Sequence, residues 1–243
     1  MKKTRHHFAI LDSTNNCGKR NAHLFDPEKL TIVTASEQTT GRGRGRHIWV
    51  SPAYENIYAT FCFFVPKSRK DLGNLAQLIS LSCASALEEF GVAPSLKWPN
   101  DIKIGDQKIG GILCEAKIIE DKVCLLNGVG INVNMSPETL DAIDQPATSL
   151  LKETGHPLDI EKVLSVLEEH VSNDLEKFLS DGFAPFLPRY KKLIGNDLHK
   201  TIRFHDNAQL WEGVFHSINE DGSLNLLLPS RQMKRFYAGQ IVA

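Results

Sequence analysis

The sequence of 243 residues lacks several features that mark particular classes of protein. No stretch approaches the roughly 20 apolar residues of a transmembrane helix. The basic N-terminus is followed by an apolar run over residues 8–11 alone, which is too short for a signal peptide. Internal repeats and low-complexity segments are also absent. We therefore expect a globular, cytoplasmic protein that does not bind a membrane.

The chain also lacks an excess of charge of either sign. Lys and Arg total 28 and Asp and Glu total 29, for a formal net charge of −1. This balance provides no overall attraction to DNA or RNA, so a role with nucleic acid would have to be local. The five cysteines are odd in number and form no C-x-x-C pair. They are more typical of reduced, buried thiols than of a zinc site.

The hydrophobic pattern predicts an α+β fold. Apolar and β-branched runs predict strands over residues 8–11, 30–35, 57–65 and 96–98, and a hairpin from 110–119 and 123–133. The run 57–65 is apolar almost throughout, which is typical of a central, buried strand. Apolar residues at three- and four-residue steps predict helices over 72–90, capped by Asp71 and ended by Gly91, and over 160–179.

The pattern changes after Pro185 and Pro188. Short strands at close spacing are predicted over residues 201–204, 209–218, 224–228 and 233–237. Short strands of this kind, over about 50 residues, are typical of a small β-barrel or sandwich. We therefore expect two domains, residues 1–195 and residues 196–243.

Three arginines alternate with three glycines over residues 41–46. Glycine lets the backbone fold over a ligand, and arginine offers a planar fork of donors that matches phosphate or carboxylate oxygens. The segment therefore predicts a mobile anion-binding loop. A solvated surface turn, or a fragment of an arginine-glycine nucleic-acid tail, is the alternative interpretation.

Three further segments carry residues suited to a ligand site. The block Lys-Trp-Pro-Asn-Asp ends at Asp101, which could hold a metal ion or accept a proton at a strand end. Lys108 stands just before Gly110 and Gly111, where a phosphate could meet both an ammonium group and the backbone, although a β-bulge would also explain the glycines. The glycines within residues 128–132 leave room for a flat ring, with Asn132 at its edge.

Together these segments resemble the biotin protein ligases (biotin–acetyl-CoA-carboxylase ligases). The family signatures are an Arg-Gly loop after a glutamine, a Lys-Trp-Pro-Asn-Asp block, a Lys-x-x-Gly-Ile-Leu block and a Gly-x-Gly-Ile-Asn block. All four are present here, and the resemblance runs from about Phe8 to the C-terminus. It implies a mixed β-sheet flanked by helices, like a class II synthetase catalytic domain, followed by an SH3-like β-barrel.

The resemblance implies an ATP-dependent ligase that uses Mg²⁺. The biotin carboxylate attacks the α-phosphate of ATP to give biotinyl-5′-adenylate, and a lysine of a biotin carrier protein then attacks that adenylate. Family members are monomers or homodimers. Because no winged-helix pattern precedes residue 12, we expect a monofunctional ligase that does not bind DNA. The alternatives are a lipoate ligase, which shares the fold, and a non-enzymatic nucleic-acid-binding module.

The resemblance also implies roles for individual residues. It places biotin against Ser13, Thr14, Asn15, Gln38, Gly41, Arg42, Gly43, Arg44, Lys108 and Gly110. It places ATP against Arg42, Arg44, Trp49, Asn100, Lys108, Gly111 and Asn132. The expected catalytic residues are Arg42, Lys108 and Asp101, and Asp101 is also the candidate metal ligand.

Two departures from the family pattern stand out. The family loop reads Gly-Arg-Gly-Arg-Arg-Gly, whereas here the last two positions are exchanged as Gly45-Arg46. The exchange keeps Arg42 and Arg44 in register and leaves Arg46 without a matched role. The C-terminus also stops at or before a position where some relatives place a basic residue.

Overall fold

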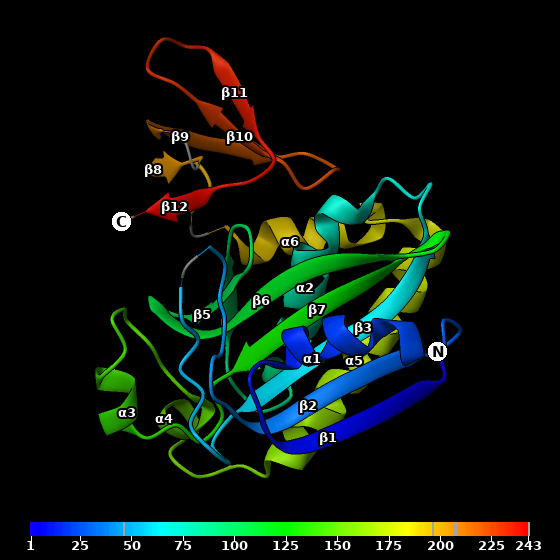
Figure 1. Ribbon diagram of the computed structural model, residues 1–243. Helices are drawn as coiled ribbons and strands as arrows, with labels where there is room; N and C mark the ends of the chain where they lie inside the picture. The colour runs from blue at the N-terminus through cyan, green and yellow to red at the C-terminus, as the bar shows by residue number, and fades with distance from the viewer. Residues whose placement is uncertain (46, 196, 207–208, 243) are drawn as a thin grey trace.

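The computed structural model describes residues 1–45, 47–195, 197–206 and 209–242. Its larger sheet has seven strands: β1 (Lys3–Leu11), β2 (Leu30–Gln38), β3 (Ile57–Pro66), β4 (Pro94–Lys97), β5 (Asp101–Ile104), β6 (Gln107–Ile119) and β7 (Lys122–Ile131). They lie in the order β1-β2-β3-β7-β6-β5-β4 (Figure 1). β1 and β2 are parallel and the other neighbouring pairs are antiparallel, so the sheet is mixed, as predicted.

Helices cover both faces of this sheet. They are α1 (Thr14–Asn21), α2 (Leu75–Glu88), α3 (Pro137–Asp141), α4 (Leu150–Thr154), α5 (Ile160–Asp181) and α6 (Leu187–Leu193), with the 3-10 turns η1 (Ala22–Leu24), η2 (Leu72–Asn74) and η3 (Ala184–Phe186). α1 lies on one face, while α2 and α5 cover the other (Figure 1). Among the described helices, none is long and apolar enough to cross a membrane.

The apolar run of β3 explains its central place. Phe61 and Phe63 are fully buried in the main core, which α2 and α5 close on one side. Cys62 points to the other face, where it is buried with Cys17 of α1 and Cys124 of β7. Burial of each large apolar side chain contributes about 2 kcal/mol, so a strand that is apolar on both faces belongs between two layers of helix.

One predicted helix start is wrong. α2 begins at Leu75, after η2, and Asp71 makes no side-chain cap hydrogen bond. The carboxylate of Asp71 instead accepts a 2.7 Å hydrogen bond from Arg69 Nε, because a nearby guanidinium competes with the helix N-terminus for it. The predicted end is sound: Gly91 follows the helix with a φ of +80°, a conformation that favours glycine.

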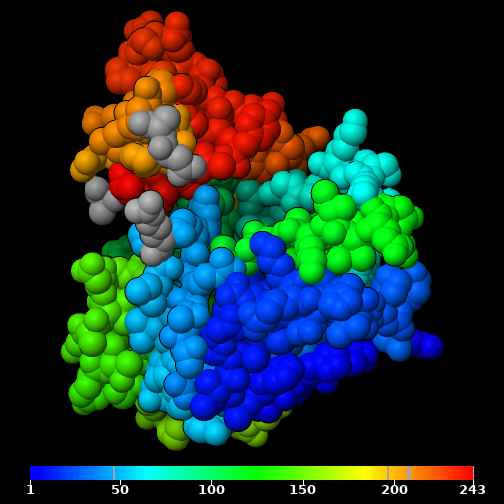
Figure 2. All heavy atoms as spheres, in the orientation of Figure 1, coloured from blue at the N-terminus to red at the C-terminus, as the bar shows by residue number. Residues whose placement is uncertain are grey.

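The C-terminal strands form a second, antiparallel sheet. They are β8 (Thr201–His205), β9 (Leu210–Ile218), β10 (Leu224–Leu227), β11 (Met233–Phe236) and β12 (Gln240–Val242), in the order β11-β10-β9-β8-β12. The last strand was not predicted. Because no pairing joins β11 to β12 within the described residues, closure into an SH3-like barrel stays a prediction. In the space-filling view, the C-terminal residues, coloured orange to red, gather at one end of the molecule (Figure 2).

A shared hydrogen-bond acceptor joins the two sheets. The carbonyl oxygen of Gly222, in the turn between β9 and β10, accepts hydrogen bonds from Trp98 Nε1 (2.9 Å) and Gln77 Nε2 (2.7 Å). The Trp98 ring also lies 5.6 Å from that of Phe204 on β8. This contact fixes the C-terminal sheet beside the Lys-Trp-Pro-Asn-Asp segment, where the candidate site begins.

Candidate active site

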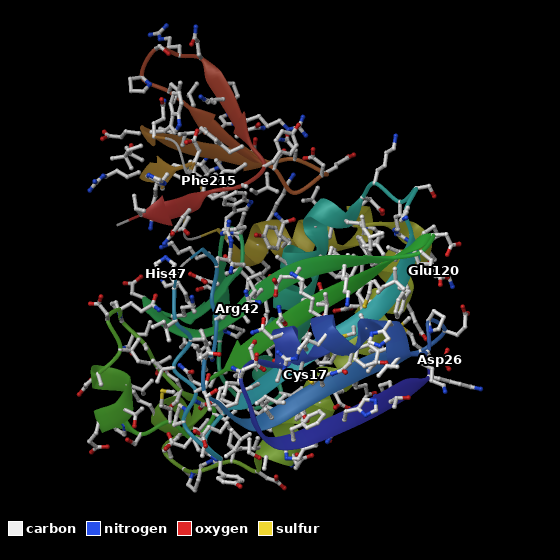
Figure 3. The ribbon with its side chains drawn as sticks, in the orientation of Figure 1. Cys17, Asp26, Arg42, His47, Glu120 and Phe215 are labelled. Atoms are coloured by element: carbon white, nitrogen blue, oxygen red, sulfur yellow. The ribbon has the colours of Figure 1, made fainter. Side chains whose placement is uncertain are left out.

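A cleft opens on the α1 side of the sheet and extends to the C-terminal sheet. Its walls come from the start of α1, the loop after β2, residues 97–101, the glycines of β6 and β7, and the start of β12. Arg42 and His47 mark the loop beside it in Figure 3. Twelve of the residues predicted for the site line this cleft: Ser13, Thr14, Asn15, Gln38, Arg42, Gly43, Arg44, Trp49, Asn100, Asp101, Lys108 and Gly111.

The Arg-Gly loop folds back on itself and covers the cleft as a lid, defined here as the described residues from 41 to 49. Arg42 and Ile48 form an antiparallel bridge, and Gly43 N donates a 2.8 Å hydrogen bond to His47 O. Gly45 has a φ of +62°, so it supplies the left-handed backbone that the turn requires. Arg46 lies outside the described residues.

The start of α1 is tied to the end of β2. Gln38 Oε1 accepts a 2.9 Å hydrogen bond from Thr14 N, and thus satisfies one of the free amides at the helix N-terminus. Thr60 Oγ1 lies 2.8 Å from Thr14 Oγ1 and 2.7 Å from Asn15 Oδ1. Ser13 precedes the helix without a side-chain cap. These buried polar groups form a pocket wall that is already organised.

Glu115 of β6 joins this wall to the lid. Its Oε2 atom accepts hydrogen bonds from Asn15 Nδ2 (2.9 Å) and Arg42 Nη2 (2.6 Å). Lys19 Nζ lies 3.4 Å from the other carboxylate oxygen. Burial alone would raise the pKa of Glu115, but the Asn15 hydrogen bond and the two cations hold the pKa below its ordinary 4.5. The carboxylate is therefore ionised at neutral pH.

Arg44 joins the lid to the far side of the cleft. Its Nη1 atom donates to Asn100 Oδ1 (3.2 Å) and to the carbonyl oxygen of Gly239 (3.0 Å). Burial lowers the pKa of Arg44 below that of a free guanidinium, and the charge of Asp101 opposes that shift. The guanidinium stays charged at neutral pH. A positive group is thus fixed between the lid and the C-terminal sheet.

Lys108 enters the cleft from a β-bulge. The pairing of β5 with β6 shifts between Ile102 and Lys103, so that Ile109 is the extra residue on β6. The bulge lies next to the glycines and does not include them, since Gly110 pairs with Ile102 and Gly111 pairs with Asp101. Bulges redirect side chains, and here Lys108 Nζ lies 2.6 Å from Asp101 Oδ1 and 5.6 Å from the centre of the Trp49 ring.

The glycine strand does leave room for a flat ring, and the Trp49 indole fills it. A Cβ atom at Gly130 would clash with the atoms of that indole. The indole Nε1 is buried without a hydrogen-bond partner, which makes this position energetically costly. Asn132 lines a small adjoining cavity behind Trp49, and its Nδ2 atom donates to Thr148 O (2.9 Å). Trp49 and Asn132 both line that cavity, and the expected place of Asn132 at the edge of a bound ring stays a prediction.

Two more predicted residues lie outside the lining. Gly41, the first residue of the lid, is packed so closely against its last residue that a side chain would collide with Trp49 O, and Gly110 faces Gly130 O within the sheet. Sequence reasoning missed His47, Gln145 and Gln240, which line the cleft. A sequence signal existed for Gln240, because the apolar residues that follow it indicate a short strand. For Gln145 we find no such signal.

The cleft favours an anionic ligand. Arg42, Arg44, Lys97 and Lys108 line it, and Asp101 is the one carboxylate among its described lining residues. Within the described chain, no group of three His, Cys, Asp or Glu side chains could hold a metal ion. Mg²⁺ commonly binds one or two carboxylates together with substrate phosphates, and Asp101 fits that mode.

The fold and the site define a class of protein: a mixed-sheet enzyme domain with a basic, lid-covered cleft suited to an anionic ligand. Comparison with protein families identifies one family. Residues 7–132 match the Biotin/lipoate A/B protein ligase family, and the chain belongs to that family.

Relatives and solved structures agree with this assignment. The chain is 30% identical to the bifunctional ligase/repressor BirA of Bacillus subtilis, over 96% of this chain and 71% of that protein. It is 30% identical to a biotin–[acetyl-CoA-carboxylase] ligase of Paracoccus denitrificans, with coverage of 82% and 84%. The biotin protein ligase of Aquifex aeolicus in complex with biotin and ATP superposes with a TM-score of 0.81 at 28% identity, with coverage of 98% and 97%.

Proposed function

We propose that this chain is an ATP-dependent biotin protein ligase, which attaches biotin to a lysine of a biotin carrier protein through biotinyl-5′-adenylate. One observation carries the proposal. The bulge at Ile109 aims Lys108 into a cleft that also receives Arg42 and Arg44 from the lid. A carboxylate and a polyphosphate repel each other, and three cations, two on the lid and one on β6, can bring them together.

In the first step, the biotin carboxylate forms a bond to the α-phosphorus of ATP and pyrophosphate leaves. Thr14, Asn15 and Gln38 form the wall that would receive the biotin rings. Lys108 and the two lid arginines would neutralise the charge that builds up on the α-phosphate oxygens. The protein need supply no nucleophile, since its main contribution is to position the two reactants.

The nucleotide would enter on the Trp49 side. Because the indole covers Gly130, the purine can reach the strand only if Trp49 moves away. Mg²⁺, when bound, offsets the negative charge of the polyphosphate, and Asp101 would be its protein ligand. Lys108 must then exchange its ion pair with Asp101 for the substrate phosphate.

In the second step, a lysine amine of the carrier attacks the acyl carbon of the adenylate, and AMP leaves as the amide forms. The lid shields the adenylate from water until the carrier arrives. Asp101 stands at the Lys108 side of the cleft, where a carboxylate can orient an incoming ammonium group.

We further propose that residues 1–195 bind biotin and ATP and that residues 196–243 form the C-terminal domain. We propose that this ligase acts as a monomer or a homodimer and does not bind DNA.

The test is a direct assay. The purified chain, incubated with labelled biotin, ATP, Mg²⁺ and a biotin carrier domain, should label the carrier and release pyrophosphate. A carrier with its acceptor lysine changed to arginine is the matched control and should stay unlabelled. Competition by lipoate in place of biotin would assign the chain to the lipoate branch. Absence of both pyrophosphate release and carrier labelling would overturn the proposal.

A further inference from the structure

Glu115 stands behind the cleft lining and contacts two residues of that lining. One oxygen atom, Oε2, accepts hydrogen bonds from Asn15 Nδ2 at 2.9 Å and from Arg42 Nη2 at 2.6 Å. Asn15 belongs to α1, on the wall proposed for biotin, and Arg42 belongs to the lid. A single carboxylate oxygen therefore joins the biotin wall to the lid.

The surroundings make this contact a strong one. The Glu115 side chain is 19% exposed and that of Arg42 is 41% exposed, so the pair is partly shielded from water. Hydrogen bonds between ionised groups are shorter and stronger than neutral ones, and the 2.6 Å contact of Arg42 with Glu115 is of this short kind. Lys19, at 3.4 Å, and Asn15 hold the carboxylate from the α1 side. Glu115 is thus fixed before Arg42 meets it.

We propose that Glu115 is a positioning residue, which docks Arg42 of the lid against the biotin wall before and during adenylate formation. This inference rests on the proposed ligase function. Glu115 does not line the cleft and would touch no reacting atom, so it acts through Arg42. The carboxylate directs the guanidinium toward the position of the biotin carboxylate and reduces the entropy that the lid must lose when the ligand binds.

The consequence is a specific kinetic change. Without the anionic partner, Arg42 is free to turn to solvent, and biotin must order the Arg42 side of the lid, while Arg44 still holds the other side. Glu115→Gln, which keeps the shape and an acceptor oxygen but removes the charge, should raise the KM for biotin roughly tenfold, the scale of one lost charge-assisted hydrogen bond. The kcat at saturating biotin should change less than KM, since Lys108 and Arg44 are untouched.

The experiment is biotin-dependent pyrophosphate exchange, measured on the full chain. The matched control is Glu88→Gln, because Glu88 pairs with Arg189 at 2.7 Å far along α2 and should leave the KM for biotin unchanged. The second arm is a double-mutant cycle. If Glu115 acts through Arg42, then Glu115→Gln should have no further effect on biotin KM in an Arg42→Ala background.

The outcomes separate the two proposals. An inactive wild-type chain would contradict the ligase function. An active wild type with an unchanged biotin KM in Glu115→Gln would overturn the positioning role alone. So would effects of the two substitutions that simply add. Thermal unfolding measures the stability of Glu115→Gln. If this variant is less stable but its folded fraction keeps the wild-type KM for biotin, Glu115 is a structural residue only.

Discussion

The guanidinium of Arg44 donates a 3.0 Å hydrogen bond to the carbonyl oxygen of Gly239, a residue 195 positions further along the chain. The same Nη1 atom donates to Asn100 Oδ1 at 3.2 Å. The lid is therefore attached at both sides: Arg42 bonds to Glu115 on β6, and Arg44 bonds to the C-terminal sheet and the Lys-Trp-Pro-Asn-Asp segment. The C-terminal residues therefore form part of the site: Gln240 lines the cleft, and Gly239 holds the lid.

Arg44→Ala should release the lid from the C-terminal sheet. We expect faster amide hydrogen exchange in residues 41–45 and 239–242, because both ends of the contact lose their partner. Adenylate formation should fall as well, since a fixed positive charge is removed. Hydrogen-exchange mass spectrometry measures the first effect. Arg231→Ala, at the β10–β11 turn, is the control; equal exchange at 41–45 in wild type and Arg44→Ala would contradict the contact.

Lys108→Ala should reduce pyrophosphate exchange by about 100-fold, the scale of losing a group that stabilises developing charge. Stability should also fall, by about 1–3 kcal/mol, because the side chains of the ion pair with Asp101 are only 20% and 26% exposed and Asp101 loses its partner. Lys103→Ala is a matched control, since Lys103 pairs with exposed Asp106 on the same sheet edge. A loss of melting temperature that accounts for the lost activity would count against a site role for Lys108.

Gly130→Ala should weaken ATP binding more than biotin binding. The added methyl group would occupy the space of the Trp49 indole and narrow the slot proposed for the purine. We expect the KM for ATP to rise and the KM for biotin to stay close to that of the wild type, both measured by pyrophosphate exchange. Gly73→Ala is the control, because a Cβ there meets its nearest atom, Asp221 O, at an ordinary 3.8 Å. An equal rise of both KM values would contradict this assignment.

Asp12→Asn should destabilise the fold in a pH-dependent way. Arg20 donates to both Asp12 oxygens at 2.7 and 2.8 Å and, with Ser13 and Asn16, holds the pKa of Asp12 well below its ordinary 3.8. As the pH falls below 3.8, the unfolded chain takes up a proton that the folded one resists, so the contribution of Asp12 to stability is lost.

The variant should therefore be less stable than the wild type at pH 7, by up to about 1 kcal/mol because the pair is partly exposed, and the difference should shrink toward pH 3. Urea unfolding at both pH values measures it. A difference that is constant between pH 7 and pH 3 would show that Asp12 contributes through something other than its charge.

Much of the fold could be predicted because single segments determine it. The apolar run of β3 predicts a strand buried on both faces, at the centre of the sheet. The apolar stripe of α5 predicts which face of that helix packs against the core. β5 and β12 could not be predicted. They have four and three residues, and their existence depends on pairing with neighbours rather than on their own sequence.

The site residues divide in the same way, into those that a local motif predicts and those whose place depends on distant contacts. Motif segments predicted the cations and the wall of α1, since each motif carries its own residues into the cleft. Glu115 was missed because its two partners, Asn15 and Arg42, lie 100 and 73 positions away. The place of Trp49 was missed because nothing local says that a lid residue will fill a slot between strands.

The shared carbonyl of Gly222 has a consequence for how this chain melts. Trp98 and Gln77 are buried in contact with the C-terminal sheet, so if that sheet separated, two hydrogen bonds and the packing of Trp98 against Phe204 would be lost. Each such hydrogen bond contributes about 1 kcal/mol, and burial of an aromatic ring contributes about 2 kcal/mol more. Separation of the sheets therefore carries a penalty comparable to a good part of a domain's stability. The two sheets should unfold in one cooperative transition, although their sequences read as separate units.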